Sequence, residues 1–479
     1  MTTTVVIGGG ITGLSTLYYL QKEVRAHGLD TKLVLIEASR TLGGKIRTVT
    51  EGGFTMETGA DSIVARKTNV APWLEELGLT DQVVYNATGT SYIYTEEGLK
   101  KIPEAAVFGI PTGLQSLAES ELVSAEGKVE ALKDFYTPNE TFTHHDSLGR
   151  FLEAFLGEEL VRKQIAPVVS GVYSGELDDL TIASTFPYLL DYKNKYGSII
   201  QGLAENKQLY LGAANKKFIS FKNGMSVLID RLEELLKTDA DIYKGTKAVS
   251  VESNGERYTV TMGDGQTIEA DYIVLSNSSS QAQELLKDKE LEAEFDQLNT
   301  KSMISVYLGF DVPDSRLPSD GTGFISVPDS DVTCDACTWT SRKWEHTSKA
   351  RKLLLRLFYK SSNPEYGRLA KLSDEELKSV ALKDVAKSLG ITAEPVSAEV
   401  TKWHENMPNY HLKHREIVES LEHKLELGYP NVILAGCSYY GVGIPDCIAN
   451  GERTARVIAE RIKHKREDRV SHGHHSDKA

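Results

Sequence analysis

Residues 3–37 read TTVVIGGGITGLSTLYYLQKEVRAHGLDTKLVLIE, and this stretch decides the fold. A β-rich run ending at Ile7 is followed by a helical pattern over 14–26 and by a second apolar run, KLVLI, over 32–36. This order predicts a β–α–β unit. The turn between the first strand and the helix has the form G-x-G-x-x-G and consists of Gly8, Gly9, Gly10, Ile11, Thr12 and Gly13.

The G-x-G-x-x-G turn predicts a dinucleotide site because of what its backbone offers. Glycines allow a tight turn and a close approach to a pyrophosphate, and the helix start adds free N–H groups. Glu37 ends the second strand, where a carboxylate accepts hydrogen bonds from a ribose. With both strands and the acid in place, dinucleotide binding is a better interpretation than a glycine-rich turn without function.

The composition is that of an ordinary globular protein of about two to four domains. The chain has 479 residues, of which 25% are charged, and a formal net charge of −14. This negative field disfavours nucleic acid and anionic membranes as partners, so an anionic substrate needs a local basic pocket. We find neither an apolar run of membrane-spanning length nor a signal peptide. Four cysteines predict no disulfide framework, and we therefore expect a cytoplasmic protein.

A glycine pair narrows the dinucleotide to FAD. It lies in ASRTLGGKIRT at 38–48, as Gly43 and Gly44 followed by Lys45, and lets the backbone pass close to a second part of the cofactor. This run resembles the GG signature of FAD-dependent amine-oxidase-like oxidoreductases, and ILAGCSYYGVGIPDCIANG at 433–451 resembles the last FAD segment of that superfamily. Together they predict FAD rather than NAD. Covalent attachment through Cys437 or Cys447 is possible, and the family resemblance given below favours non-covalent FAD.

The predicted fold class is α/β, with a discontinuous Rossmann-like FAD-binding domain, a mixed-sheet substrate domain and a helical insert domain. The FAD-binding domain is expected to comprise residues 1–75, 220–280 and 395–464. We expect the substrate domain at 76–102 and 281–394, the mainly helical insert at 103–219 and a disordered tail at 465–479.

Further motifs, in unbroken order to about residue 462, resemble one family closely. They are ETGADS (57–62), IPEAAVFGIPT (102–112), SGVYSGELDDLTIASTFP (170–187), ACTWTSRKW (336–344), WHENMPNYHLKH (403–414) and GVGIPDCI (441–448). The set resembles the protoporphyrinogen/coproporphyrinogen III oxidases of haem biosynthesis, and most of all the soluble type of Gram-positive bacteria. An amine oxidase on the same fold is the alternative, with Tyr439 and Tyr440 as a partial aromatic pair.

The resemblance implies oxidation of coproporphyrinogen III to coproporphyrin III, or of protoporphyrinogen IX to protoporphyrin IX, in three two-electron steps. Each step would pass a hydride to the flavin, with molecular oxygen as the final acceptor and hydrogen peroxide as by-product. The substrate supplies the electron push from its own pyrrole nitrogens, so we expect no dedicated acid–base residues. We expect a monomer, and peripheral contact of the insert with a membrane stays open.

The resemblance also assigns cofactor contacts by motif position. The pyrophosphate is expected at the G-x-G-x-x-G turn, and the other contacts are Glu37 and Ala38 for the adenosine ribose, Gly43, Gly44 and Lys45 towards the flavin, Gly59, Ala60, Asp61 and Ser62 beside the isoalloxazine, Ala248 for adenine, Trp403 near the flavin ring, Gly436 at the ribityl chain, and Val442, Gly443 and Ile444 at the pyrimidine edge.

Two positions depart from the family pattern. Mitochondrial-type enzymes carry an arginine where this chain has Asp61, so Lys67, and secondly Arg66, are our candidates for holding a substrate carboxylate. Cys437 stands where many flavin amine oxidases have an acid. Phe324, Ile325 and Trp339 are candidate apolar pocket residues, with core packing as the plain alternative.

We predict no metal site. The pair Cys334 and Cys337 lacks two further ligands at a suitable spacing and is interpreted as buried strand cysteines. The pair His411 and His414 also lacks partners in sequence.

Overall fold

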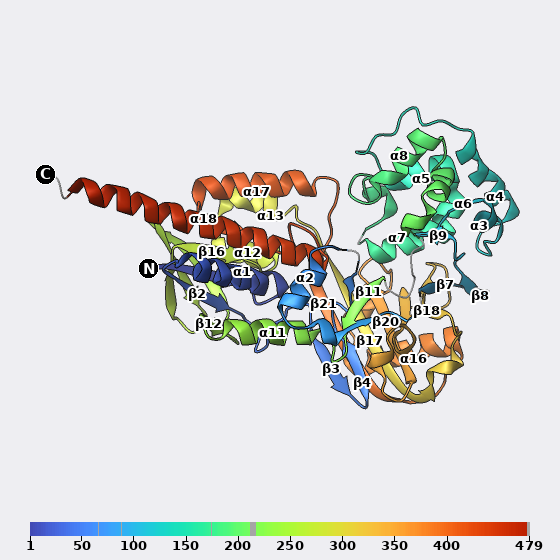
Figure 1. Cartoon of the computed structure of the whole chain (residues 1–479). Helices are drawn as coiled ribbons and strands as arrows, with labels where there is room; N and C mark the ends of the chain where they lie inside the picture. The colour runs from blue at the N-terminus through green and yellow to red at the C-terminus, as the bar shows by residue number, and fades with distance from the viewer. Residues whose placement is uncertain (66, 88, 174, 211–216, 477–479) are drawn as a thin grey trace.

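The computed structural model describes residues 1–65, 67–87, 89–173, 175–210 and 217–476. It forms three regions, visible in Figure 1. A nucleotide-binding region with a parallel sheet lies at one end, a region around a seven-stranded sheet lies at the other, and a helical insert packs beside the second sheet. The predicted α/β class is confirmed.

The parallel sheet has five strands in the order β12-β2-β1-β16-β22. Their bounds are Ala240–Tyr243, Thr31–Ile36, Thr2–Ile7, Tyr272–Leu275 and Val432–Leu434. The predicted β–α–β unit is confirmed, since β1 and β2 pair in parallel and α1 (Ile11–His27) connects them. All six residues of β1 are buried, as expected for a parallel strand covered on both faces.

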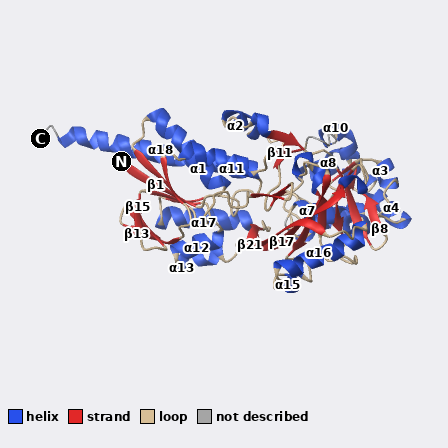
Figure 2. Ribbon diagram, turned by 90° about the horizontal axis from the view of Figure 1, so that it is seen from below, coloured by secondary structure: helices blue, strands red, loops and turns tan. Residues whose placement is uncertain are grey.

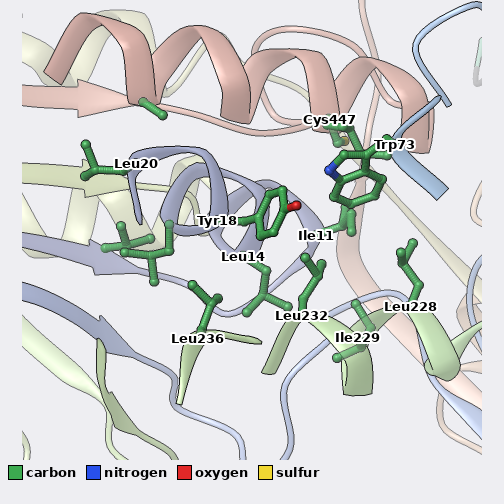
Figure 3. Packing of buried hydrophobic residues seen from close by; sticks show 14 of the residues in the cluster. Ile11, Leu14, Tyr18, Leu20, Trp73, Leu228, Ile229, Leu232, Leu236 and Cys447 are labelled. Carbon is green, nitrogen blue, oxygen red and sulfur yellow. The ribbon is translucent and has the colours of Figure 1, made fainter. Parts of the chain in front are cut away.

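Helices cover both faces of this sheet, as Figure 2 shows. On one face α1 packs with α11 (Ser226–Leu236), α18 (Ile444–Ser476) and α2 (Val70–Glu76), and Figure 3 shows Leu14 and Tyr18 of α1 among the side chains of this core. On the other face lie α12 (Ser279–Leu286), α13 (Lys289–Phe295) and α17 (His414–Gly428). Because Leu285 and Phe295 belong to that core, the nucleotide-binding region continues beyond residue 280, where the sequence analysis ended this segment.

A hairpin turn follows Asn254. It joins β13 (Ala248–Asn254) to β14 (Arg257–Met262), and β15 (Thr267–Ala270) completes a three-stranded antiparallel sheet.

The seven-stranded sheet has the order β21-β17-β20-β19-β18-β7-β8. The bounds are Pro395–Pro408, Thr300–Pro313, Lys352–Lys360, Ala336–Trp339, Gly321–Ser326, Thr90–Thr95 and Gly98–Lys101. The helix α16 (Asp374–Leu389) packs against one face. The edge strand β21 moves one predicted domain boundary, because residues 395–408 pair with β17 and not with the parallel sheet. The nucleotide-binding region therefore resumes after β21 and not at residue 395.

The insert beside the seven-stranded sheet is mainly helical. Its α-helices are α3 (Leu114–Ala118), α4 (Ala125–Ala131), α5 (Leu148–Leu156), α6 (Glu158–Leu160), α7 (Ala166–Val172), α8 (Pro187–Tyr196), α9 (Ile199–Glu205) and α10 (Lys207–Tyr210), with a π-turn, η3 (Val161–Ile165), between α6 and α7.

Short elements complete the chain. They are β3 (Thr48–Glu51), β4 (Phe54–Glu57), β5 (Ile63–Val64), β6 (Val83–Tyr85), β9 (Ala106–Val107), β10 (Ile110–Pro111), β11 (Phe218–Phe221), α14 (Thr340–Lys343), α15 (Tyr366–Leu369), and the 3-10 turns η1 (Thr80–Gln82), η2 (Leu132–Phe135), η4 (Leu177–Asp179), η6 (Asp314–Arg316) and η7 (Glu345–Thr347).

The C-terminal helix α18 continues to Ser476, whereas the sequence predicted disorder from residue 465. The start of that tail is tied down, because the ammonium groups of Lys463 and Lys465 lie 3.1 and 3.0 Å from carboxylates of Glu23 and Asp271. Lys463 and Lys465 therefore form ion pairs with residues of the nucleotide-binding region, although the sequence around them resembles a solvated tail. Among the described residues, no helix combines the length and apolarity needed to span a membrane.

The core of the helical insert contains a buried ion pair. Lys193 and Asp134 are both fully buried, with 3.1 Å between Nζ and Oδ1. The Asp134 carboxylate also accepts hydrogen bonds from the backbone N–H groups of Ile199 and Ile200, so one carboxylate fixes the start of α9 as well. Burial lowers the pKa of Lys193, and the neighbouring Asp134 opposes that shift.

Removing the carboxylate is expected to destabilise the insert strongly. Asp134→Ala would leave the Lys193 ammonium buried without a counter-charge, at a cost of about 3–5 kcal/mol. Circular dichroism during denaturant unfolding measures this loss. The matched control is Glu130→Ala, which breaks a partly exposed pair with Lys133 and is expected to cost less than about 1 kcal/mol. Equal effects of the two substitutions would contradict the prediction.

Candidate active site

The glycine turn between β1 and α1 is tightly packed at Gly13 and open at Gly10. A Cβ added at Gly13 would lie 2.0 Å from the carbonyl oxygen of Gly8, so only glycine lets the helix approach the strand this closely. A Cβ added at Gly10 would meet nothing within 4 Å. No side chain among the described residues caps α1, which leaves the first N–H groups of the helix free for an anion in front of Gly10.

The second glycine motif docks directly on the first. The backbone N–H of Gly43 donates to the carbonyl oxygen of Gly9 at 2.8 Å, and Gly10 and Gly43 form a parallel bridge. Gly43 and Gly44 have φ values of +117° and +57°, a conformation that favours glycine. Two motifs about thirty residues apart thus make one continuous backbone surface.

Glu37 is oriented by the same turn. Its carboxylate accepts hydrogen bonds from the backbone N–H groups of Gly9 and Ser39, both at 2.7 Å. Each carboxylate oxygen keeps a lone pair for a ribose hydroxyl. Ala38 is exposed beside it, and Ala248 begins β13 two residues after Thr246, whose N–H donates to the Glu37 carbonyl. The three residues assigned to the adenosine end therefore lie in adjoining segments.

The C-terminal segment returns to the same place. Gly436 lies beside Thr12 of α1: a Cβ added at Gly436 would lie 3.6 Å from the Thr12 hydroxyl oxygen. Its N–H donates to the buried side chain of Asn450 at 2.8 Å. Next to it, the Lys45 ammonium lies 3.2 Å from the Cys437 sulfur, so the residue that replaces the family acid is paired with a cation.

The loop that follows ends at α18. Val442 is 59% exposed, Gly443 is partly exposed and Ile444 is buried as the first residue of the helix. Tyr410 holds this loop, because its hydroxyl donates to the Cys437 carbonyl at 2.5 Å and accepts from the Gly441 N–H at 2.7 Å.

The segment 58–62 is held by donors from the seven-stranded sheet. The buried Arg356 guanidinium donates to the carbonyl oxygens of Thr58 and Gly59 at 3.0 and 3.1 Å. The Trp403 indole N–H donates to the same Thr58 carbonyl at 2.9 Å. On the other side the Ala60 N–H donates to the carbonyl of Lys45, so this segment connects the glycine motifs to the second sheet.

Asp61 is the charged member of that segment. Its carboxylate lies 3.4 Å from the Lys343 ammonium and accepts a hydrogen bond from the Ser62 hydroxyl at 2.7 Å. Burial would raise the pKa of Asp61, but Lys343 and Arg356 outweigh it and hold the pKa below its usual value. An ionised carboxylate therefore stands where related enzymes have an arginine.

The residues predicted to contact the substrate differ in their placement. Lys67 forms a partly exposed ion pair with Asp446, at 3.4 Å, and Arg66 lies outside the described residues. Phe324 and Trp339 were wrong choices: they are 2% and 0% exposed and lie in the core beneath α16, where Phe324 packs against Tyr94. Ile325, the neighbour of Phe324 in the strand, points to the opposite face and is partly exposed.

The four cysteines are free thiols, and burial raises the pKa of Cys334, Cys337 and Cys447. Cys334 and Cys337 belong to the core of the seven-stranded sheet. His414 stacks on Tyr410 with ring centroids 3.8 Å apart, and its Nε2 lies 3.1 Å from the Tyr439 carbonyl oxygen. These contacts are those of packing residues.

Sequence reasoning missed Arg356, Lys343 and Tyr410 as parts of the site. A signal for Arg356 existed, because an arginine inside the apolar run LLLRLF must be paired when buried. Lys343 and Tyr410 lie in motifs that the analysis quoted, but only the fold brings them to Asp61 and Cys437.

This geometry fits FAD. The open space at Gly10 and the uncapped helix start suit a pyrophosphate, and Glu37 suits a ribose. Lys45, the segment 58–62 and the loop 436–443 continue from there in mutual contact, as an extended cofactor requires.

Comparison with known proteins agrees with this assignment. Residues 11–459 match the family model of flavin containing amine oxidoreductases. The chain is 35% identical to coproporphyrinogen III oxidase of Bacillus subtilis (strain 168), covering 94% of this chain and 96% of that protein. It is 31% identical to coproporphyrinogen III oxidase of Staphylococcus aureus, covering 95% and 98% of the two chains.

Solved structures show the same fold. A protein from Exiguobacterium sp. 255-15 that is assigned as a protoporphyrinogen oxidase superposes with a TM-score of 0.87 at 32% identity, covering 96% of this chain and 99% of its own. Putrescine oxidase superposes with a TM-score of 0.64 at 16% identity, covering 95% and 98%, which is a likeness of fold alone.

The open space at Gly10 predicts a selective loss of cofactor. Gly10→Ala is expected to leave folding intact, because the new methyl meets no protein atom, and to weaken FAD binding roughly ten-fold by occupying the pyrophosphate side. Flavin fluorescence titration of the FAD-free protein measures the dissociation constant. Gly113→Ala is the control, since Gly113 also precedes a helix and has open space. Unchanged FAD affinity in Gly10→Ala would contradict the assignment.

Glu57, which precedes the segment 58–62, predicts a pH dependence. It is 4% exposed, and burial raises its pKa from 4.5 to about 7 even though Met225 and Thr48 donate to the carboxylate. Between these two pH values the folded protein holds a proton that the unfolded chain has released. Stability from this group is therefore present below pH 4.5 and lost as pH rises towards 7.

Glu57→Gln is expected to remove that dependence, which amounts to about 3 kcal/mol across the window. The measurement is denaturant unfolding at several pH values. Glu75→Gln, at an exposed position, should leave the slope unchanged. A wild-type stability that does not fall relative to Glu57→Gln as pH rises would count against the buried acid.

Proposed function

Because the chain belongs to the flavin containing amine oxidoreductase family, we propose that it uses FAD to oxidise coproporphyrinogen III to coproporphyrin III in haem biosynthesis. The observation that carries the proposal is the full-length similarity to enzymes named for that reaction. When bound, FAD supplies the two-electron acceptor.

In that reaction, residues of this chain position the segment 58–62 beside the flavin. Arg356 and Trp403 hold the carbonyl groups of Thr58, and with them the segment that the proposal places beside the flavin. The substrate acquires positive charge as it gives up hydride, and the Asp61 carboxylate on that segment is ionised, with Lys343 as its counter-ion. We propose no acid–base triad, since the pyrrole nitrogens supply the electron push and binding supplies the orientation.

Further parts of the proposal come from the sequence analysis. They are molecular oxygen as the final acceptor, protoporphyrinogen IX as a second substrate, a monomeric enzyme in the cytoplasm, and the individual cofactor contacts described above. Lys67 is retained as one carboxylate contact, in competition with Asp446.

The amine oxidase alternative finds no support in the placement of its aromatic residues. Tyr439 is 3% exposed and packs in the core behind the parallel sheet. Tyr440 packs against the same core, and its hydroxyl donates to Glu422. Both rings therefore have packing partners in the core behind the parallel sheet.

An anaerobic assay tests the proposal. Coproporphyrinogen III added to the FAD-loaded protein without oxygen is expected to bleach the absorbance of the oxidised flavin. Admission of oxygen should then restore that absorbance and raise porphyrin fluorescence, with hydrogen peroxide formed in parallel. The control omits the protein and gives the autoxidation rate. Flavin bleaching by common amines, together with porphyrin formation at only the autoxidation rate, would replace the proposal by the amine oxidase alternative.

A further inference from the structure

The seven-stranded sheet has two unlike faces. One face forms the apolar core beneath α16. The opposite face, here called the inner face, carries side chains that are only partly buried: Met303, Ile325, Ala336, Phe358, Lys360 and Trp403.

Strand register places these six residues on one face. Met303 lies opposite both Lys360 and Trp403, and Ala336 lies opposite both Ile325 and Phe358. Directly opposed residues share a face, and so do residues two apart in one strand, which joins Phe358 to Lys360. Trp403 donates to the Thr58 carbonyl, so the inner face adjoins the segment assigned to the flavin. It is therefore the surface on which a substrate of the flavin would lie.

Lys360 is the one cation among these six residues, and the only hydrogen-bond partner of its ammonium among the described residues is a neutral carbonyl group. Its ammonium donates to the carbonyl oxygen of Ser170, at the end of α7, at 2.8 Å. Among the residues that the structure describes, no carboxylate lies within ion-pair distance of it. A lysine ammonium has three N–H donors, so two remain for another acceptor. Burial lowers the pKa of Lys360, although Asp335 and Glu176 oppose the shift from longer range.

The nearest acid is already committed elsewhere. The Asp335 carboxylate accepts a hydrogen bond from the Lys360 backbone N–H at 2.6 Å and another from the side chain of Asn363 at 3.2 Å. Two other cations beside the site have carboxylate partners, Lys343 with Asp61 and Lys67 with Asp446, and Lys45 lies against the Cys437 sulfur near the glycine motifs. Lys360 is therefore a half-buried cation without a carboxylate partner among the described residues, and it lies at the edge of an apolar surface.

We propose that Lys360 binds a propionate carboxylate of the porphyrin substrate, while the macrocycle lies along the apolar residues of the inner face. This inference rests on the proposed function, since it takes its anion from that substrate. A porphyrinogen with carboxylates on its rim and an apolar centre matches a lysine beside methionine, isoleucine and phenylalanine side chains. The ammonium keeps its hydrogen bond to the α7 carbonyl and gives a second one to the carboxylate.

Two variants separate charge from packing. Lys360→Gln keeps a donor for the Ser170 carbonyl and loses the charge, whereas Lys360→Arg keeps the charge. The matched control is Lys402→Gln: Lys402 also donates to a backbone carbonyl, that of Leu372, but alternates with Trp403 and so lies on the opposite face. Binding of the stable product, coproporphyrin III, and of its neutral tetramethyl ester is measured by fluorescence titration of the FAD-loaded proteins.

Lys360→Gln is expected to weaken binding of coproporphyrin III roughly ten-fold and to leave binding of the ester unchanged. The Michaelis constant for coproporphyrinogen III should rise by the same factor with kcat nearly constant, and flavin content should match the wild type. Lys360→Arg and Lys402→Gln should bind both ligands like the wild type.

The inference is overturned if Lys360→Gln binds coproporphyrin III like the wild type, if the ester loses affinity equally, or if Lys360→Arg is as weak as Lys360→Gln. Failure of the proposed function looks different. In that case the wild type binds the porphyrin but does not turn over the porphyrinogen, and the titration still decides whether Lys360 holds a carboxylate.

Discussion

The close approach of α1 to β1 at Gly13 is the constraint on which the site depends. With 2.0 Å between the position of an added Cβ and the Gly8 carbonyl oxygen, no other residue permits it. Three later segments meet the glycine turn or the start of α1. Gly43 bonds to Gly9, Gly436 approaches Thr12, and an added Cβ at Gly451 would lie 2.7 Å from the Ser15 side chain. Residues that are remote in sequence can form one cofactor surface because small side chains let their backbones meet here.

A second constraint joins that surface to the substrate side. Arg356 is 3% exposed, so its charge must be satisfied inside the protein, and the carbonyl oxygens of Thr58 and Gly59 satisfy it. The Nε–H donates to the Ser305 hydroxyl, and the guanidinium lies 5.1 Å from the Tyr307 ring centroid. A buried arginine held by three hydrogen bonds fixes the distance between the flavin segment and the inner face more firmly than an exposed pair would.

The sequence predicted the parts of the structure whose physics is local. The β–α–β unit follows from periodicity and turn residues, and the structure has it. The domain limits failed where long-range pairing decides: β21 joins β17, and Phe295 packs behind the parallel sheet. Phe324 failed for a related reason, because the choice between two strand faces needs the register of neighbours. Asp61 was recognised as a departure, but its partner Lys343 lies about 280 residues away and only the fold brings them together.

The distribution of charge explains how a protein with a net charge of −14 can accept an anionic substrate. The global field opposes the approach of a carboxylate, so binding must come from short-range contacts with cations that are shielded from that field. Other cations at the site already have partners: Lys343 and Lys67 face carboxylates, Arg356 donates to carbonyl oxygens, and Lys45 lies against the Cys437 sulfur. A new anion at those positions would have to displace an existing partner. Lys360 has only a neutral carbonyl to give up or share, so a carboxylate gains more there than at any of the paired cations.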